Sequence, residues 1–276
     1  MDRIRLIASD MDATLLDEQS QLPADFEETI HALAELGIRF APASGRPLYT
    51  LEAMFPTLQD ELVFIGDNGG AIRWKGQNLF TSEMSPEGWQ ALNRLTREQG
   101  DIAVLCGLES AYVERPFAVH DAVLRHFYTK IEYVDRLEDV TAPADKFTIY
   151  LPQHNAQQAY DTVYASQRSI YSVAVAGECW VDIMNPGVHK GAALQTLGQL
   201  WGLPSESIMA FGDTYNDAEM LQIVRYGFLM ENGSAPLRQK VPFLAPSHRE
   251  AGVMQVLHRV LAQNGCVCPE DFVPAH

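Results

Sequence analysis

The chain has 276 residues, of which 47% are hydrophobic, which is enough for one large domain or two modest ones. Its formal net charge of −16 argues against nucleic acid and against an anionic membrane as the main partner. No stretch approaches the ~20 apolar residues of a membrane-spanning helix, and the N-terminal residues do not have the pattern of a signal peptide.

The first third of the chain alternates strand-like and helix-like segments. Apolar runs typical of buried strands lie at 4–9, 38–44 and 61–68, and a hairpin is predicted at 72–80. Residues 22–37 have helical spacing of apolar side chains and end in a glycine. Strands separated by helical crossovers predict a parallel sheet that is covered on both faces.

The middle of the chain has a different pattern. Helices are predicted at 85–100, 120–128 and 155–167, and strands at 102–107, 111–116, 146–152 and on both sides of Gly177 within 169–185. Paired strands with helices between them predict an antiparallel sheet with helices on one face. We therefore expect a separate α+β domain at 83–187.

The last third returns to the first pattern. Helices are predicted at 189–202, 216–224 and 249–265, and strands at 207–213, 226–231 and 241–246. The predicted fold class is therefore α/β: a Rossmann-like parallel-sheet core, made of residues 1–82 and 188–276, with an inserted α+β domain.

Polar residues gather where three strands of the predicted parallel sheet end. They are Asp10 and Asp12 after the first strand, Ser44 and Gly45 after the second, and Asp213, Asn216 and Asp217 after a later one. Lys190 lies at the start of a helix, where the backbone N–H groups favour anions. Ligands bind beyond the carboxyl ends of parallel strands, and clustered carboxylates suit Mg²⁺.

Each of these residues has an ordinary structural explanation when it is taken alone. Asp10 and Asp12 are compatible with turn or helix-capping residues, and Asp213 with a helix cap. Ser44 and Gly45 are typical of a turn, and Lys190 of a solvated first helical turn. Only their combination at one edge of one sheet favours a catalytic site.

Four motifs in order make the sequence resemble the haloacid dehalogenase-like phosphatases, in the Cof-type branch with a large inserted cap. The motifs are "DMDAT" (10–14), Ser44 in "ASGRP", Lys190 in "NPGVHKGAAL" and "GDTYND" (212–217), and "GDNGG" (66–70) and "LMENGSA" (229–235) resemble further Cof-type segments. The resemblance covers essentially the whole chain. One residue departs from it: the family has glycine where this chain has Ala13, which would cost ~1 kcal/mol if the position requires a positive φ.

The resemblance implies a role for each residue. Asp10 would be the nucleophile that forms an aspartyl-phosphate, and Asp12 the general acid and base. Mg²⁺ would be held by the Asp10 carboxylate, the Asp12 main-chain carbonyl and Asp213. Phosphate oxygens would be bound by Ser44, the Gly45 amide, Lys190 and Asn216. Asp217 would orient Lys190 or a metal-bound water, and the inserted domain at 83–187 would act as the substrate-specificity cap.

The implied function is a Mg²⁺-dependent phosphatase of small phosphorylated metabolites, such as sugar or cofactor phosphates. Two alternatives remain open: a phosphomutase of related fold, and a phosphate-binding protein whose catalysis has decayed, for which Ala13 is the one hint. Four cysteines without a CxxC pair or a zinc spacing indicate free thiols and a cytoplasmic protein. We further expect a monomer or homodimer.

Overall fold

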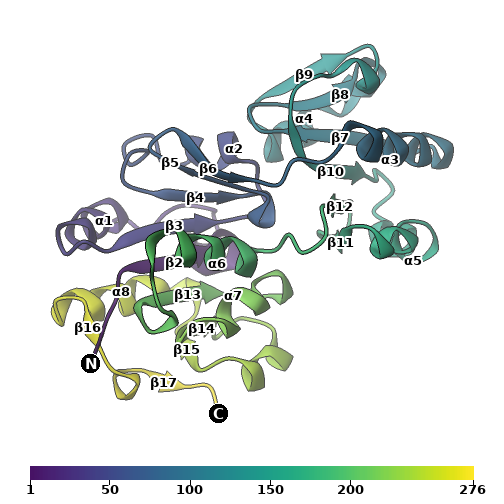
Figure 1. Cartoon of the computed structure of the whole chain (residues 1–276). Helices are drawn as coiled ribbons and strands as arrows, with labels where there is room; N and C mark the ends of the chain where they lie inside the picture. Colours follow the sequence, from purple (N-terminus) through teal and green to yellow (C-terminus); the bar gives the residue numbers. More distant parts are fainter. The chain divides into compact units, whose positions relative to one another are not determined.

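The computed structural model describes residues 1–276, which divide into two compact units (Figure 1). The core unit contains Met1–Gly45, Phe55–Leu79 and His189–His276, and the second unit contains Arg46–Met54 and Phe80–Val188. The second unit thus contains residues 46–54, 80–82 and 188, whereas the sequence predicted all of these residues in the core.

The core unit is built on a nine-stranded sheet in the order β17-β15-β14-β13-β2-β3-β4-β5-β6. Its strands are β2 (Leu6–Asp10), β3 (Arg39–Ala43), β4 (Val63–Gly66), β5 (Ala71–Trp74), β6 (Gln77–Thr81), β13 (Ile208–Gly212), β14 (Tyr226–Met230), β15 (Phe243–Ala245) and β17 (Val273–Pro274). The six strands from β15 to β4 are parallel. All residues of β2, β13 and β14 are buried, as expected for strands covered on both faces.

Four helices accompany this sheet: α1 (Phe26–Glu35), α6 (Lys190–Trp201), α7 (Ala218–Gln222) and α8 (Gly252–Ala262). The chain moves from β2 to β3 in one direction, and from β13 to β14 in the other. Because crossover connections are right-handed, this reversal puts α1 and α7 on opposite faces. α8 packs against α1, and α6 packs against α7. The parallel, doubly covered sheet predicted from the sequence is confirmed.

Antiparallel strands lie at the two edges of the sheet. β5 and β6 form the predicted hairpin, and its turn residues Lys75 and Gly76 both have a positive φ (51° and 71°). β17 pairs with β15, and β1 (Asp2–Arg3) pairs separately with β16 (Cys266–Val267). The sequence pattern did not predict these short terminal strands, because two residues carry too little periodicity.

The second unit contains a six-stranded sheet in the order β11-β12-β10-β7-β8-β9. Its elements are α2 (Leu48–Ala53), α3 (Pro86–Gln99), β7 (Ile102–Gly107), β8 (Ala111–Glu114), α4 (Asp121–Phe127), β9 (Ile131–Val134), β10 (Ala144–Tyr150), α5 (Ala156–Thr162), β11 (Ser172–Val175) and β12 (Trp180–Met184). α2 and β9 were not predicted, and α5 ends five residues before the predicted helix does.

Two details of the prediction for this unit are wrong. The sheet is mixed, because β8 and β9 pair in parallel. Helices also pack on both of its faces. Phe147 and Ile149 of β10 share a cluster with α3 and α5, whereas the alternate residue Tyr150 shares a cluster with Leu124 of α4. Side chains alternate between the faces of a strand, so β10 contributes to a core on each side.

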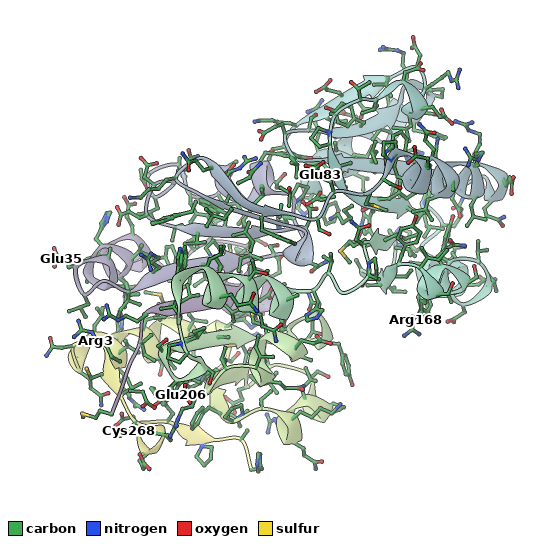
Figure 2. The ribbon with its side chains drawn as sticks, in the orientation of Figure 1. Arg3, Glu35, Glu83, Arg168, Glu206 and Cys268 are labelled. Atoms are coloured by element: carbon green, nitrogen blue, oxygen red, sulfur yellow. The ribbon has the colours of Figure 1, made fainter.

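The charged surface is spread over both units. Glu35 and Glu206 of the core unit are exposed, and so are Glu83 and Arg168 of the second unit (Figure 2). The four cysteines are all unpaired, as expected. No helix of this structure has both the length and the apolar composition that crossing a membrane requires.

Close backbone packing in the core unit leads to a stability prediction. A Cβ on Gly227 of β14 would lie 1.9 Å from the Leu221 carbonyl oxygen, whereas a Cβ on Gly198 inside α6 would meet nothing closer than 3.4 Å. We expect Gly227→Ala to lower the free energy of unfolding by ~1–3 kcal/mol, as overpacking does. The matched Gly198→Ala should raise it by ~0.5–1 kcal/mol, because alanine is the better helix former. Urea unfolding of both variants checks the pair, and a Gly227→Ala protein as stable as the wild type would contradict the packing described.

Candidate active site

The candidate site lies where the strand order of the core sheet reverses. β2 and β13 are neighbours, and the chain leaves them in opposite directions. Asp10 is the last residue of β2, and Asp213 directly follows β13. In an open parallel sheet, such a reversal opens a crevice at the carboxyl ends of the strands. The topology therefore brings Asp10 and Asp213 together although 202 residues separate them.

Asp12 lies in a wide turn, Met11–Leu15, which the Leu16 N–H closes by donating to the Met11 carbonyl. Asp12 is exposed, whereas Thr14 and Leu15 are buried and anchor the turn. Ala13 has φ 60° and ψ 13°, in the left-handed region. The condition attached to Ala13 is thus met: the position has a positive φ, and the Cβ of alanine costs ~1 kcal/mol there.

Lys190 is the first residue of α6 and is completely buried. His189 caps this helix by accepting a hydrogen bond from the Ala192 N–H at 3.2 Å. The loop at 67–70 lies close to the helix start, because a Cβ on Gly69 would come within 2.6 Å of the His189 carbonyl oxygen. The ordinary explanation of Lys190 as a solvated first-turn residue is therefore wrong.

The Lys190 ammonium lies between two carboxylates. Its Nζ donates to Oδ1 of Asp10 and, at 2.7 Å, to Oδ1 of Asp217. The other oxygen of Asp217 accepts from the main-chain N–H groups of Asp213 (3.1 Å) and Thr214 (3.2 Å). Both Asp217 oxygens are thus engaged within the protein, which supports the orienting role predicted for Asp217.

Glycine at position 212 makes this arrangement possible. A Cβ on Gly212 would lie 2.4 Å from the Cβ of Asp217. Only a residue without a side chain lets Asp217 lie so close to the end of β13. The position of Asp217, the last residue of "GDTYND", therefore requires glycine at the first position of this motif.

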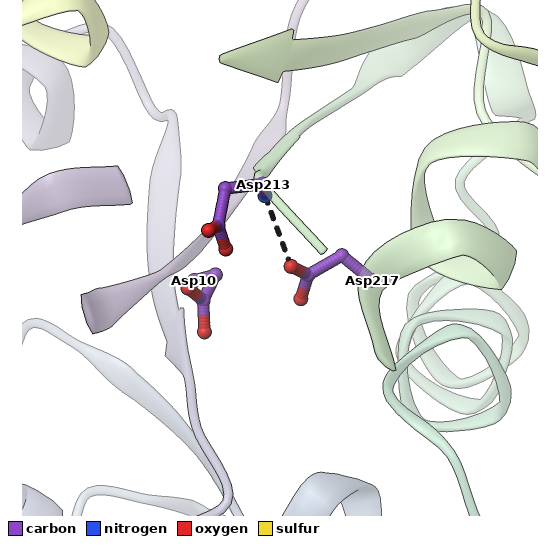
Figure 3. Close-up of side chains that lie close together, drawn as sticks. All are labelled: Asp10, Asp213 and Asp217. Carbon is purple, nitrogen blue, oxygen red and sulfur yellow. Dashed lines mark hydrogen bonds between the residues drawn. The ribbon is translucent and has the colours of Figure 1, made fainter. Parts of the chain in front are cut away.

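Asp10, Asp213 and Asp217 form an acidic triad in which one oxygen of each carboxylate lies within 4.8 Å of the others (Figure 3). The single charge of Lys190 balances only one of the three. Carboxylate oxygens are the ligands that Mg²⁺ prefers, and a divalent cation would balance the remaining two charges. The donor set therefore fits the predicted magnesium site, with Asp10 and Asp213 as its carboxylate ligands.

Two carboxylates of the acidic triad, those of Asp10 and Asp213, have raised pKa values. Burial raises the pKa of Asp10 to about 7; Lys190 opposes this shift, and the charges of Asp217 and Asp213 add to it. The pKa of Asp213 is raised to about 6, chiefly by burial and then by the charge of Asp217, with a smaller contribution from Asp12. For Lys190, burial lowers the pKa but the two carboxylates outweigh it, so that its pKa is raised. Lys190 is therefore permanently charged.

Apart from Lys190 of α6, the residues predicted to bind phosphate lie on two loops, and Asn68 lies close to both. Ser44 is buried at the end of β3, and a Cβ on Gly45 would lie 3.2 Å from the Asn68 side-chain amide. Asn216, which is exposed, donates from Nδ2 to Asn68 Oδ1 at 3.4 Å. The sequence motifs assigned no role to Asn68, which lies within the "GDNGG" segment. Its φ of 53° lies in the left-handed region, which asparagine adopts more readily than most residues with a side chain.

Known proteins that are similar to this chain include hydrolases and phosphatases. The sequence profile of the haloacid dehalogenase-like hydrolases matches residues 7–257. The 5-amino-6-(5-phospho-D-ribitylamino)uracil phosphatase YbjI of Escherichia coli K12 is 31% identical, over 94% of this chain and 96% of the relative. An HMP-PP phosphatase of Cronobacter sakazakii is also 31% identical, over 87% of this chain and 89% of the relative. A HAD/COF-like hydrolase from Plasmodium vivax has the same fold, with a TM-score of 0.84 at 18% identity over 95% of this chain and 97% of the other.

The raised pKa values lead to a prediction about cation binding. Without a cation, Asp10 and Asp213 bind more protons in the folded protein than in the unfolded chain. This difference exists between pH 3.8, the ordinary carboxyl pKa, and the raised pKa values of about 6 to 7. These groups therefore favour the folded state most below pH 3.8, and their contribution is lost as the pH rises through 6 to 7. Mg²⁺ requires both carboxylates ionised, so binding should release protons at about pH 6 and almost none at about pH 8.

Isothermal titration of MgCl₂ in buffers of different ionisation enthalpy measures this proton release. The affinity for Mg²⁺ should increase with pH over the same range. Asp213→Asn removes one ligand and should abolish both the binding and the release. Mg²⁺ binding to the wild type without proton release at the lower pH would contradict the assigned pKa values.

Proposed function

The chain belongs to the haloacid dehalogenase-like hydrolase family, and on this basis we propose that it is a Cof-type phosphatase, which hydrolyses phosphate monoesters of small metabolites through an aspartyl-phosphate. The observation that carries the proposal is the completely buried Lys190 held between Asp10 and Asp217 at the carboxyl edge of the sheet. A permanent positive charge beside a carboxylate nucleophile suits a reaction that brings an anionic phosphate to that carboxylate.

In the first half of the reaction, a carboxylate oxygen of Asp10 attacks the phosphorus. A bond forms between this oxygen and phosphorus while the bond from phosphorus to the ester oxygen breaks. Asp12 donates its proton to the leaving oxygen, which departs as an alcohol. Asp12 is exposed in the turn that follows Asp10, where a substrate can reach it.

In the second half, Asp12 removes a proton from a water molecule whose oxygen attacks the phosphorus. The bond between phosphorus and the Asp10 oxygen breaks, which releases inorganic phosphate and restores the Asp10 carboxylate. Asp12 is then protonated again, ready for the next substrate. The two carboxylates near the end of β2 thus divide the work of nucleophile and acid–base catalyst.

Phosphate oxygens are bound in this proposal by Ser44, the Gly45 amide, Lys190 and Asn216. The contact between Asn216 and Asn68, and the closeness of Gly45 to Asn68, support a common phosphate site formed by these loops. The Asp10 and Asp213 carboxylates and the Asp12 main-chain carbonyl would hold Mg²⁺, which when bound supplies positive charge between nucleophile and phosphate.

The substrate proposed first is a phosphorylated sugar-alcohol derivative, such as the 5-amino-6-(5-phospho-D-ribitylamino)uracil in the name of the Escherichia coli relative. The second unit is proposed to select the leaving group, because the core unit supplies all of the residues proposed for the chemistry. A screen of phosphorylated metabolites with Mg²⁺, measuring released phosphate, tests the phosphatase activity and the proposed substrate. A protein that releases phosphate from none of them would refute the phosphatase proposal.

Ala13 is compatible with activity. Ala13 adopts the left-handed conformation that glycine would adopt at this position. The turn therefore has the same backbone path, and the Cβ of alanine lowers the stability of the fold by ~1 kcal/mol. Such a cost is small against the ~5–15 kcal/mol by which folded domains are stable. Ala13 therefore gives no support to a decayed, binding-only protein.

We predict that Asp10→Asn abolishes turnover, by several powers of ten, because an amide cannot form the acyl phosphate. Substrate affinity should survive, since the variant removes a negative charge from the phosphate site. Steady-state kinetics and equilibrium binding of the best substrate from the screen measure the two effects. The covalent mechanism fails if this variant keeps about a tenth of the wild-type kcat.

Asp12→Asn should act through the leaving group. An alkyl phosphate needs a proton on its departing oxygen, whereas p-nitrophenolate leaves without one. Single-turnover phosphorylation of Asp12→Asn should therefore slow much more with the best alkyl phosphate than with p-nitrophenyl phosphate. Equal losses with the two substrates would exclude Asp12 as the acid.

A further inference from the structure

The loop that follows β14, residues 231–234, contacts the backbone on both sides of the acidic triad. Asn232 donates from its side-chain Nδ2 to the main-chain carbonyl of Ala13 at 2.9 Å. The main-chain N–H of Ser234 donates to the Asp213 carbonyl at 2.7 Å. One loop thus joins the turn that carries Asp12 to the end of β13.

The orientation of the Asn232 side chain is determined by its partners. Its Oδ1 accepts from the main-chain N–H of His248 at 3.0 Å, while its Nδ2 faces the Ala13 carbonyl. A main-chain N–H can only donate and a carbonyl can only accept, so the two ends of this amide are not interchangeable. Asn232 therefore links the Ala13 turn to the segment that precedes α8.

The loop is also held close to β13. A Cβ on Gly233 would lie 2.7 Å from the Asp213 carbonyl oxygen and 2.9 Å from that of Met230. This close packing prevents the loop from moving nearer to β13, and the hydrogen bond from the Ser234 N–H to the Asp213 carbonyl opposes movement away from it. The Asn232 amide consequently meets the Ala13 carbonyl from a fixed position.

The contact falls on the strained residue of the turn. Ala13 has φ 60° and ψ 13°, and the direction of its carbonyl depends on ψ. Residues with a Cβ avoid this left-handed conformation, so the turn needs a contact that selects it. The hydrogen bond from Asn232 does so one residue away from Asp12.

We propose that Asn232 is a positioning residue, which acts through the Ala13 carbonyl to hold Asp12 where it can transfer its proton. The inference rests on the function proposed above and adds to it a residue outside the acidic triad and the phosphate loops. Asn232 is exposed, so its removal uncovers no hydrophobic core. A loss of catalysis in an Asn232 variant would therefore reflect geometry rather than unfolding.

The test compares Asn232→Ala with the wild type on p-nitrophenyl phosphate and on the best alkyl phosphate from the screen. A displaced Asp12 should lower kcat/KM for the alkyl phosphate by about 10-fold or more, because small misplacements are costly in catalysis. The loss on p-nitrophenyl phosphate should stay below about 3-fold, since its leaving group needs no proton. The urea midpoint should change little. Asn78→Ala is the matched control, because Asn78 is an asparagine with one side-chain contact, from Arg73 at 2.7 Å, outside the site.

A second arm asks whether the effect passes through Ala13. Adding Ala13→Gly to Asn232→Ala removes the Cβ that disfavours the left-handed conformation at residue 13. The turn should therefore populate its native conformation more often without the hydrogen bond from Asn232. We expect this double variant to recover part of the lost activity on the alkyl phosphate. Adding Gly198→Ala instead stabilises the core unit without touching the turn, and should recover none.

Two results would overturn the proposal while leaving the phosphatase function intact: equal losses of Asn232→Ala on the two substrates, and equal recovery by Ala13→Gly and Gly198→Ala. Either would reduce Asn232 to a residue of general stability. Failure of the phosphatase function itself has a different signature, since the wild type would then release phosphate from neither ester.

Discussion

The placement of one ammonium group among carboxylates is the constraint on which the site depends. Lys190 is completely buried and donates to Asp10 and to Asp217, and Asp213 lies beside them. An isolated buried charge would cost several kcal/mol or more, so neither the lysine nor the carboxylates would be stable there alone. Their mutual compensation ties together the end of β2, the start of α6 and the turn before α7. An excess of negative charge remains, which a divalent cation would balance.

The backbone around this cluster departs from ordinary preferences in several places. Gly212 and Gly69 allow approaches that a Cβ would prevent, and Ala13 and Asn68 have a positive φ despite their side chains. Strain of this kind persists only where surrounding contacts hold it. Here the contacts are visible: Asn232 binds the Ala13 carbonyl, and Asn68 receives the Asn216 amide. The loops of Asn68 and Asn232, which carry no carboxylate of the triad, thus hold the segments next to Asp10 and Asp217 in place.

The second unit follows a different principle. Its mixed sheet has a hydrophobic cluster on each face, and its buried charged residues are Asp145, Lys146 and Asp182. Asp182 of β12 accepts from Thr148 of β10 at 2.7 Å and lies 3.8 Å from the Lys146 ammonium on the same strand β10. The carboxylate of Asp182 is thus paired by an adjacent strand, whereas Lys190 and its two carboxylates in the core unit come from distant segments. This contrast is in keeping with chemistry in the core unit and selection of the leaving group in the second.

The sequence by itself determined the elements with strong periodicity and the motifs at strand ends. Local patterns predict the parallel core, the Lys75-Gly76 hairpin and the polar ends of β2, β3 and β13. The reason is that neighbouring residues alone indicate whether a strand is buried and where a turn needs glycine. Only the tertiary structure decided what depends on partners far along the chain. The burial of Lys190, the role of Asn68, the contact of Asn232 with Ala13 and the mixed pairing of β8 with β9 are of this kind. A charge becomes buried only when distant segments of the chain pack around it, and a side-chain amide supports a turn only when the fold brings the two together. No local pattern of residues carries that information.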